Sequence, residues 1–345
     1  MKRWQSLLLG LVISVAALYV ALRGAQLNRV AEALGSARYG FALLTIVILG
    51  ASTYVRGLRW SAVLRGRLSP TRGFWLFNTG FLFNNVLPLR LGEIVRVYLA
   101  ARQPPLRFAE VLSSIVVERL IDMLSVVAIL AVLLQIPQLP VPQWAANAGL
   151  LMLIGALVGI GALYLAARFP DWIASTAGRL LEHFPLPERF TAESVVGQLE
   201  SFLDGLVSLR DPVAFLKALG YSALAWLMSG VAGWVLLFAF AEFGSPGLEI
   251  GFLAIAAAGL GIAVPSLPGA VGPFEAAVKL ALVAVGYAQE PALSYALVLH
   301  GVNFVTTSVL GAIGLLREGI SFGEVASAAR ELGKTHPEDT ERVTA

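Results

Sequence analysis

Leu87-Pro88-Leu89-Arg90-Leu91-Gly92 is one of two Leu-Pro-x-x-x-Gly elements in this chain, and Leu267-Pro268-Gly269-Ala270-Val271-Gly272 is the other. Each is followed within three residues by a glutamate, Glu93 or Glu275. A membrane helix that is broken by Pro and Gly must satisfy its freed backbone groups inside protein or around a wet cavity. The two elements lie 180 residues apart, so they predict a polar site at membrane depth and suggest an internal repeat of two comparable halves.

The composition is that of an integral membrane protein. Hydrophobic residues make up 57% of the 345 residues, charged residues only 14%, and the mean hydropathy is +0.77. This leaves room for roughly six to eight spans of about 20 residues and for no large domain outside the membrane. Cysteine is absent, which excludes disulfides, thiol catalysis and cysteine metal ligands. The net charge of +3 is too small to indicate a nucleic-acid partner.

We predict an all-α, polytopic membrane protein with about six full spans and two re-entrant broken-helix hairpins. The first apolar stretch is taken as an uncleaved span because it lacks a small-residue cleavage site. The predicted spans are Trp4 to Leu22, Tyr39 to Val55, Val111 to Ile136, Ala148 to Ala167, Val213 to Phe240 and Pro291 to Leu316. The hairpins are predicted at residues 74–102 and 261–275, entering from opposite faces as an inverted repeat would produce. Residues 241–290 could instead form two short full spans.

The distribution of arginine predicts the orientation. Five arginines and no acid follow the second span, which marks that loop as cytoplasmic and therefore the N-terminus as well. They are Arg56, Arg59, Arg65, Arg67 and Arg72. We expect a transmembrane domain over residues 1–320, with possible repeat halves at about 1–168 and 213–320. An amphipathic segment, 169–212, would join the halves, and residues 321–345 would form a cytoplasmic tail. The expected location is the cell inner membrane.

Ionisable and amide side chains inside hydrophobic runs are the candidate site residues. A charge at the bilayer centre costs at least about 2.5 to 3.5 kcal/mol, so such groups face the bundle interior or an aqueous cavity. The predicted binding residues are Asn85, Arg90, Glu93, Arg96, Glu118, Arg119, Asp122, Glu275, Lys279, His300 and Asn303. The predicted structural breaks are Pro88, Gly92, Pro268 and Gly272. No catalytic residue, metal site or cofactor is predicted.

Helical spacing predicts three ion pairs among these residues. They are Glu93 with Arg96, Arg119 with Asp122, and Glu275 with Lys279; partners three or four residues apart share a helix face. Each pair alone could simply lock a hairpin against a helix. The concentration of charge beside both breaks favours a functional site. His300 by itself is more typical of a helix-packing residue than of a ligand or a proton carrier.

The chain also resembles a known family. The run from Asn84 to Arg96, the segment Glu118-Arg119-Leu120-Ile121-Asp122 and the run from Pro265 to Glu275 are similar to those of the lysylphosphatidylglycerol synthase transmembrane-domain family, also called the flippase-like family. The resemblance covers about residues 5 to 320, and the order of the motifs is more specific than any one of them.

The resemblance implies a membrane domain associated with moving lipids between leaflets. In bifunctional members a soluble domain that aminoacylates phosphatidylglycerol follows it. This chain stops at Ala345, so we expect only the membrane-domain function here. Stand-alone relatives occur near pathways for lipid-linked glycans and hopanoids, which leaves the cargo open and makes a separate lipid or glycan biosynthetic enzyme a possible partner.

The predicted function is a lipid flippase or transporter for a polar-headed, anionic or lipid-phosphate-linked lipid. Arg90, Arg96 and Arg119 would hold the anionic headgroup, because the guanidinium fork binds phosphate in a bidentate way. The carboxylates would balance those cations or accept an amine. Two alternatives stay open: an integral-membrane enzyme that acts on a lipid-linked sugar or lipid phosphate, and a scaffold for a separate lipid synthase.

The energy source is a further hypothesis. No P-loop sequence is present, so ATP is not expected to drive movement, and transport would be passive or ion-coupled. Glu118 and Asp122 share a helix face and would repel each other when both are ionised, so one of them could carry a proton.

Overall fold

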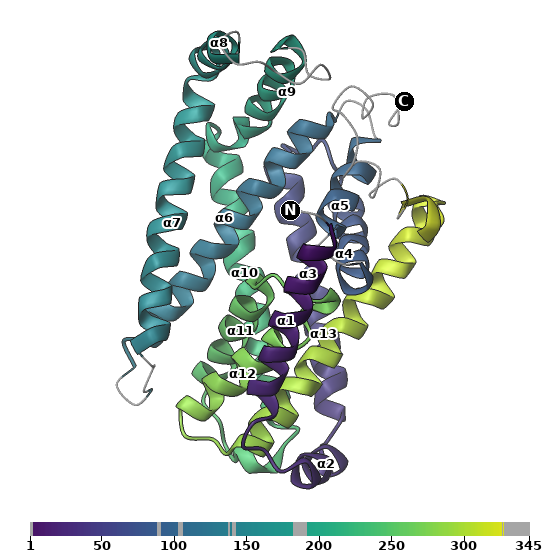
Figure 1. The fold of residues 1–345 in the computed structure, drawn as a ribbon, viewed down its shortest axis with the longest axis vertical. Helices are drawn as coiled ribbons and strands as arrows, with labels where there is room; N and C mark the ends of the chain where they lie inside the picture. Colours follow the sequence, from purple (N-terminus) through teal and green to yellow (C-terminus); the bar gives the residue numbers. More distant parts are fainter. Residues whose placement is uncertain are drawn as a thin grey trace.

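The structure is a computed structural model, and it describes residues 3–87, 91–102, 106–136, 139, 143–181, 192–325 and 327. All regular structure in these residues is helical (Figure 1). The helices are α1 (Arg3–Leu22), α2 (Leu27–Ser36), α3 (Gly40–Val63), α4 (Pro70–Val86), α5 (Gly92–Ala101), α6 (Phe108–Leu133), α7 (Gln143–Arg168), α8 (Pro170–Leu181), α9 (Ala192–Gly205), α10 (Pro212–Leu237), α11 (Leu248–Ala263), α12 (Pro273–Ala284) and α13 (Gln289–Glu318). The predicted break Pro88, the predicted binding residue Arg90 and most of the predicted tail lie outside the described residues.

The all-α, polytopic fold class is confirmed. Within the described residues, α3, α10 and α13 are long and apolar enough to cross a membrane. The pairs α1–α2 and α7–α8 add two candidates, bent by 80° and 92°, so length and composition support three to five spans. The prediction of six also counted α6. Helix α6 has 26 residues, which is long enough to cross a membrane. It carries Glu118, Arg119 and Asp122 in its middle, however, and these charges distinguish it from a simple lipid-facing span.

Local sequence signals set the starts of two helices that frame the site. At α4, Ser69 accepts a hydrogen bond from the Arg72 amide, and Pro70 occupies the first turn. At α10, the Asp211 carboxylate accepts from the amides of Val213 and Ala214 at 3.0 and 3.2 Å. A short polar side chain at the N-cap satisfies amides that have no partner within the helix.

The arginine-rich loop was predicted wrongly at its start. Helix α3 continues eight residues beyond the predicted span end, to Val63, and so it contains Arg56 and Arg59. Arg59 is fully buried. These two arginines therefore belong to the bundle interior, because acidic partners on α6 compensate their charge there.

The first predicted hairpin is formed by α4 and α5. Helices of 17 and 10 residues measure about 25 and 15 Å, shorter than the ~30 Å hydrocarbon core. The Gly92 amide donates to Asn84 Oδ1 at 2.8 Å, which fastens the two arms beside the break. A Cβ at Gly92 would overlap the Gly80 carbonyl oxygen, so glycine is required for this close approach.

The second hairpin is formed by α11 and α12, with 16 and 12 residues. Its tip contains a 3₁₀ turn at Pro268–Ala270 and has positive φ at Gly269, Ala270 and Gly272, of 73°, 59° and 97°. Two short helices that meet at such a turn favour the hairpin over two full spans. The Leu267 amide donates to Ser14 Oγ at 2.9 Å, which fixes the tip against α1.

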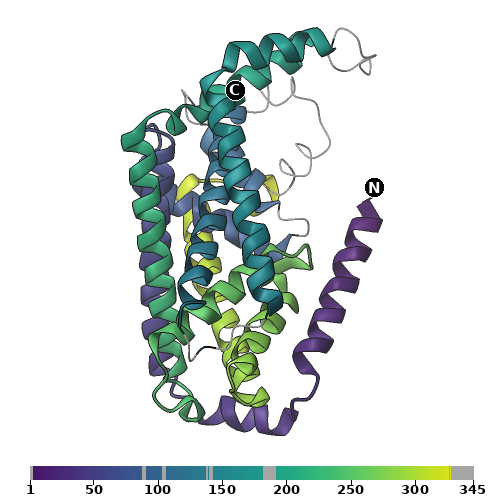
Figure 2. The same ribbon diagram turned by 90° about the vertical axis from the view of Figure 1, so that its left-hand side faces the viewer.

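In Figure 1, α4 and α5 lie in the upper part of the bundle, and α11 and α12 lie in its lower part. The 3₁₀ turn of the second hairpin contacts α4 of the first, so the tips meet inside the bundle. Figure 2 shows α1 at the edge of the bundle, connected to it by α2, which lies across the lower end. This opposed arrangement is the one expected of an inverted repeat, which stays a prediction.

Separate apolar cores hold the hairpins. One core surrounds the second hairpin and includes Phe274, Phe240 and Tyr295. Another lies at the first hairpin and includes Trp60 and Phe83. Because each hairpin is packed into its own core, the polar groups of the tips are held between the two cores.

Candidate functional site

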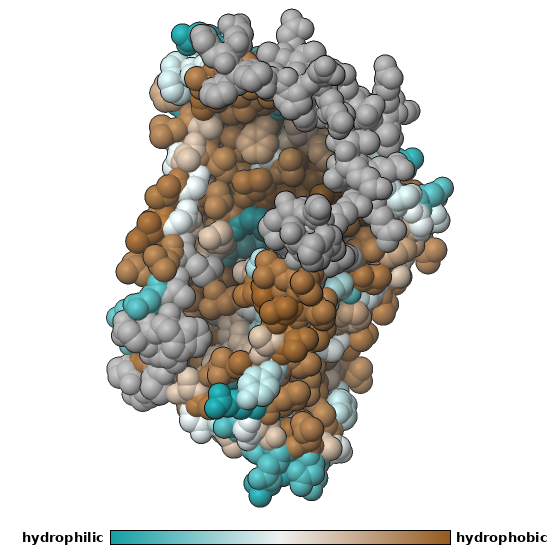
Figure 3. Space-filling model, viewed as in Figure 1, coloured by the Kyte–Doolittle hydropathy of each residue, from teal (hydrophilic) through white to brown (hydrophobic). Residues whose placement is uncertain are grey.

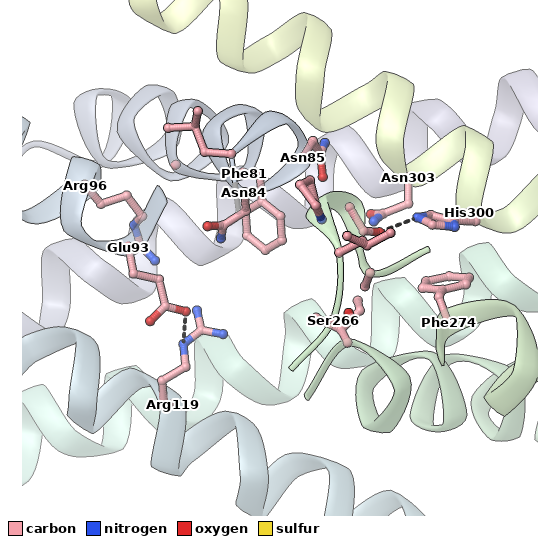
Figure 4. A pocket seen from close by; sticks show the side chains of 17 residues that line it. Phe81, Asn84, Asn85, Glu93, Arg96, Arg119, Ser266, Phe274, His300 and Asn303 are labelled. Carbon is pink, nitrogen blue, oxygen red and sulfur yellow. Dashed lines mark hydrogen bonds and ion pairs between the residues drawn. The ribbon is translucent and has the colours of Figure 1, made fainter. Parts of the chain in front are cut away.

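The candidate site lies where the two hairpin tips meet. A small pocket of about 70 Å³ is lined from the first hairpin by Asn84, Asn85, Glu93 and Arg96, and from the second by residues 266–270. Arg119, His300 and Asn303 complete its polar lining from α6 and α13. Figure 4 shows Glu93, Arg96 and Arg119 gathered on one side and Phe274, His300 and Asn303 on the other. The pocket therefore collects polar groups from both halves of the chain.

A larger cavity of about 360 Å³ adjoins this pocket. Arg119 and Asn303 line both spaces, as do Phe81, Ile262 and Phe274. The larger cavity is mostly apolar, with Arg56, Asp122 and several hydroxyl groups in its wall. The face drawn in Figure 3 is hollowed, and hydrophilic surface lies deep inside walls of hydrophobic residues. A polar region that opens into an apolar one suits an amphiphilic ligand.

Arg59 organises the charges beside the pocket. Its Nη2 lies 2.7 Å from Glu118 Oε1, and its Nη1 lies 2.6 Å from Asp122 Oδ1. Nη1 also donates to Ser222 Oγ at 3.1 Å. Because one guanidinium bridges both carboxylates, the repulsion on which the predicted Glu118–Asp122 proton site depended is offset.

Arg96 does not form the predicted pair with Glu93. It donates instead to Glu118 Oε2 at 2.9 Å, and both side chains are buried. Its guanidinium carbon lies 4.3 Å from the centre of the Trp60 ring and 4.8 Å from that of Phe77. The sequence spacing within α5 placed Arg96 and Glu93 on one face, but the aromatic rings of α3 and α4 stabilise the Arg96 cation deeper in the bundle.

Arg119 is held more loosely than Arg59 and Arg96. Its nearest carboxylate oxygens are Glu93 Oε1 and Glu118 Oε1 at 3.6 Å and Asp122 Oδ2 at 3.8 Å. These separations exceed hydrogen-bond length, and its Nε has no hydrogen-bond partner. The side chain is 39% exposed, against 0% for Arg59 and 2% for Arg96. Arg119 is thus the cluster guanidinium most available to a ligand.

Asp122 extends the cluster to the larger cavity. Its Oδ1 accepts from Trp226 Nε1 at 3.1 Å and lies 3.4 Å from Arg56 Nη1. Arg56 also lies over the Trp226 ring, 5.3 Å from its centre. The described cluster holds four arginines and three carboxylates, which are Arg56, Arg59, Arg96 and Arg119 with Glu93, Glu118 and Asp122. One positive charge is therefore in excess among these residues.

Sequence reasoning missed Arg56, Arg59, Ser222 and Trp226 as members of this cluster. Arg56 and Arg59 are three residues apart and directly continue the apolar run of α3. That spacing places them on one helix face and could have indicated a helical extension. Ser222 and Trp226 carry no such signal, because a hydroxyl and an indole are common in any membrane helix.

His300 and Glu275 form a second polar centre at the tip of the other hairpin. His300 Nδ1 lies 2.6 Å from Glu275 Oε1, and His300 Nε2 lies 2.7 Å from the Gly269 carbonyl oxygen. Glu275 Oε2 accepts from the Gly272 amide at 2.8 Å. The imidazole is stacked on Phe274, with 4.4 Å between the ring centres. His300 therefore joins α13 to both sides of the break.

The predicted pair between Glu275 and Lys279 is not formed. Lys279 Nζ donates to the carbonyl oxygens of Ala21 and Arg23 at 2.8 and 2.7 Å. A cation at a helix C-terminus satisfies carbonyl groups that have no partner within the helix. Lys279 therefore anchors the end of α1, and it does not line either cavity.

The remaining predicted binding residues, Asn85 and Asn303, occupy different positions in the site. Asn85 Nδ2 donates to Thr307 Oγ1 and Ser308 Oγ, at 3.2 and 2.9 Å, and so ties the first tip to α13. Asn303 lies at the junction of the two cavities. Of the predicted breaks, Pro268 lines the small pocket.

Comparison with known proteins agrees with this architecture. The family described as the lysylphosphatidylglycerol synthase TM region matches residues 7–311. A UPF0104 membrane protein of Methanothermobacter thermautotrophicus is 25% identical over 302 residues, which is 83% of this chain and 86% of that protein. No solved structure shows a significant match.

A second relative is longer than this chain. The glycosyltransferase AglD of Haloferax volcanii is 24% identical over 359 residues, covering 94% of this chain but 56% of that protein. The chain thus spans little more than half the length of this relative. The name of the relative describes that protein over its full length.

Proposed function

This chain belongs to the family of the lysylphosphatidylglycerol synthase transmembrane region, and we propose that it moves a lipid with an anionic headgroup between the leaflets of the cell inner membrane. The observation that carries the proposal is the position of Arg119. It lies between the two broken hairpins, lines both cavities and is 39% exposed. A phosphate that reached it would gain charge-assisted hydrogen bonds from a guanidinium that has no short ones inside the protein.

The neighbouring charges support an anionic rather than a cationic headgroup. The described cluster has one guanidinium more than it has carboxylates, and a bound phosphate would balance this excess. Backbone groups at the tip of the second hairpin would add hydrogen bonds, since residues 266–270 line the same pocket. Broken helices supply such backbone groups at membrane depth in many transporters.

The larger cavity offers a place for the first carbons of the lipid tail. Leu49, Phe77, Met123, Val126 and Ile255 form part of its apolar wall. Its volume of about 360 Å³ is too small for a whole two-chain lipid, so the tails would extend from the cavity into the bilayer. This division keeps the polar headgroup inside the protein, where it avoids the cost of crossing the hydrocarbon core.

Charges outside the cluster support a proposed orientation. Arg65 and Arg67 lie in the loop between α3 and α4, and we assign this loop to the cytoplasm. Arg72 at the start of α4 binds Glu318 at the end of α13 at 2.7 Å, which places the end of α13 on the same side. The first hairpin then opens toward the cytoplasm and the second toward the outside.

The test is leaflet exchange of labelled lipids in proteoliposomes that contain the full chain. Labelled phosphatidylglycerol, its aminoacylated form and phosphatidylcholine are compared for wild type, Arg119→Gln and the matched control Arg107→Gln. Arg107 pairs with Asp204 on the surface, and both side chains are more than half exposed. We expect selective exchange of the anionic lipid, reduced about tenfold or more by Arg119→Gln and unchanged by Arg107→Gln. Wild-type rates in folded Arg119→Gln would overturn the site assignment.

An integral-membrane enzyme acting on a lipid-linked sugar or lipid phosphate is the second candidate, favoured by the name of the Haloferax relative. In that case the carboxylates near Arg119 would act as acid and base. Purified protein incubated with a prenyl-phosphate sugar and a lipid acceptor distinguishes the two. Formation of a new lipid product, lost in Glu93→Gln, would support the enzyme, whereas exchange without product supports the transporter.

A further inference from the structure

The contacts of His300 fix how many protons this site must hold. Gly269 offers a carbonyl oxygen, which can only accept, so His300 Nε2 must carry a proton to form its 2.7 Å contact. Nδ1 lies 2.6 Å from Glu275 Oε1, and this contact also needs a proton. Either the histidine is doubly protonated beside a carboxylate, or a neutral histidine accepts from a protonated glutamate. In both cases one proton is shared by the pair.

We propose that His300 and Glu275 form a proton-binding site that controls the position of the second hairpin tip. When one proton leaves to solvent water, the neutral imidazole beside the ionised Glu275 keeps a single N–H. One of its two contacts, at 2.6 or 2.7 Å, then brings two acceptors together, so that contact opens. His300 is the side chain that joins α13 to Gly269 on one side of the break and, through Glu275, to Gly272 on the other.

The surroundings make this pair suitable for proton exchange. Both side chains are mostly buried, with residue exposures of 8% for His300 and 4% for Glu275, yet His300 lines the small pocket. The proton therefore has a polar route, while water is excluded from the rest of the contact. Phe274 is stacked on one face of the imidazole.

Other charged groups, including Asp122 of the adjoining cavity, surround the pair. Glu93, Arg96 and Arg119 line the same pocket from α5 and α6, and Arg56 lines the adjoining cavity from α3. Lys279, one helical turn after Glu275, directs its ammonium to α1. The pocket-lining side chains of α4 and α11 are uncharged. An anion bound at Arg119 would add negative charge to the pocket of His300, which favours the proton-loaded pair.

The proton site rests on the proposed function only where it makes lipid movement proton-coupled. Binding of an anionic headgroup and retention of the proton would support each other. Release of the proton would free the tip from α13. The proton site itself is a property of the folded chain and can be measured without any transport.

The first experiment observes the proton directly. Full-length protein labelled with ¹⁵N-histidine is placed in lipid nanodiscs, and the ring nitrogen signals are followed between about pH 5 and 9. The chain has three histidines, His183, His300 and His336, and the His300→Gln variant assigns the signal of interest. We expect two protonated ring nitrogens at low pH and a single protonated ring nitrogen after one proton is lost as pH rises. Glu275→Gln should change that titration. A single unchanging tautomer, or a titration unaffected by Glu275→Gln, would overturn the proposal.

The second experiment observes the tip. Ser266→Cys introduces a thiol into a chain that has none, at a position that lines the small pocket. We expect its reaction with a water-soluble maleimide, corrected for the pH dependence of the thiol, to accelerate about tenfold when the pair loses its proton. The control Ser229→Cys, in the larger cavity, should show no such change. Equal acceleration at both positions, or at neither, would contradict control of the tip.

The third experiment connects the site to transport. In proteoliposomes with an imposed pH gradient, wild type should move anionic lipid faster than without the gradient, and Glu275→Gln should exchange lipid without responding to it. A wild type that exchanges lipid but ignores the gradient would reject the coupling. Absence of all exchange, together with a normal His300 titration, would reject the proposed function and leave the proton site standing.

Discussion

Arg59 Nη2 lies 2.7 Å from Glu118 Oε1, and both side chains have 0% exposure. A buried ion pair is weak evidence for net stability, but the removal of one partner leaves an uncompensated charge. The bundle is therefore sensitive to the loss of Arg59, although Arg96 still contacts the other oxygen of Glu118 at 2.9 Å.

Arg59→Met is expected to lower the free energy of unfolding by about 3 to 5 kcal/mol. Denaturant-induced unfolding in detergent, followed by circular dichroism, measures the change. The exposed pair of Arg107 with Asp204 provides the control, because Arg107→Met should cost less than about 1 kcal/mol. Equal effects of the two substitutions would show that Arg59 is not the centre of the cluster.

Glu93→Gln is expected to strengthen binding of an anionic lipid. Glu93 Oε1 lies 3.6 Å from Arg119 Nε and competes with a ligand for that guanidinium. The attraction between these two partly exposed charges is ~1 kcal/mol, so its loss should lower the Kd of the anionic lipid about fivefold. Titration with short-chain phosphatidylglycerol measures this Kd. An unchanged or weaker affinity would place the headgroup elsewhere.

Gly272→Ala and Gly286→Ala are compared because the two glycines have nearly the same φ, 97° and 98°. A Cβ at Gly286 meets open space, whereas one at Gly272 would overlap the carbonyl oxygen of Ser14 on α1. Both variants place an alanine at a positive φ, which is strained and costs on the order of 1 to 3 kcal/mol. We expect Gly272→Ala to be the more destabilised of the two in thermal unfolding. Similar values would mean that α1 does not pack closely against the tip.

Lys279→Met is expected to loosen α1 and leave lipid binding unchanged. The ammonium holds the carbonyl groups of Ala21 and Arg23, so its removal should accelerate amide hydrogen exchange at the end of α1. Exchange monitored by mass spectrometry reports this directly. If the variant instead lost anionic-lipid affinity with normal protection of α1, the sequence-based assignment of Lys279 to the binding site would be restored.

The sequence by itself determined the fold class and the region of the site. Hydropathy required an all-α membrane bundle, and the two Leu-Pro-x-x-x-Gly breaks marked the tips that meet in the pocket. Intramembrane charge was likewise sufficient to select Glu93, Arg119 and His300, because such groups have to face a polar interior. These conclusions depend only on local composition and on helical period.

Of the three pairs predicted from helical spacing, that of Arg119 with Asp122 is formed, with 3.8 Å between the nearest atoms; only the tertiary structure decided which partners the other charges meet. Helical spacing pairs residues on one helix, and it therefore predicted Glu93 with Arg96 and Glu275 with Lys279. The contacts that form instead cross between helices, from Arg96 to Glu118 and from Glu275 to His300. A buried charge is stabilised by the nearest compensating group in space, and the packing of distant segments sets that distance. For the same reason Arg59, assigned to a loop from its sequence, is buried between the carboxylates of α6.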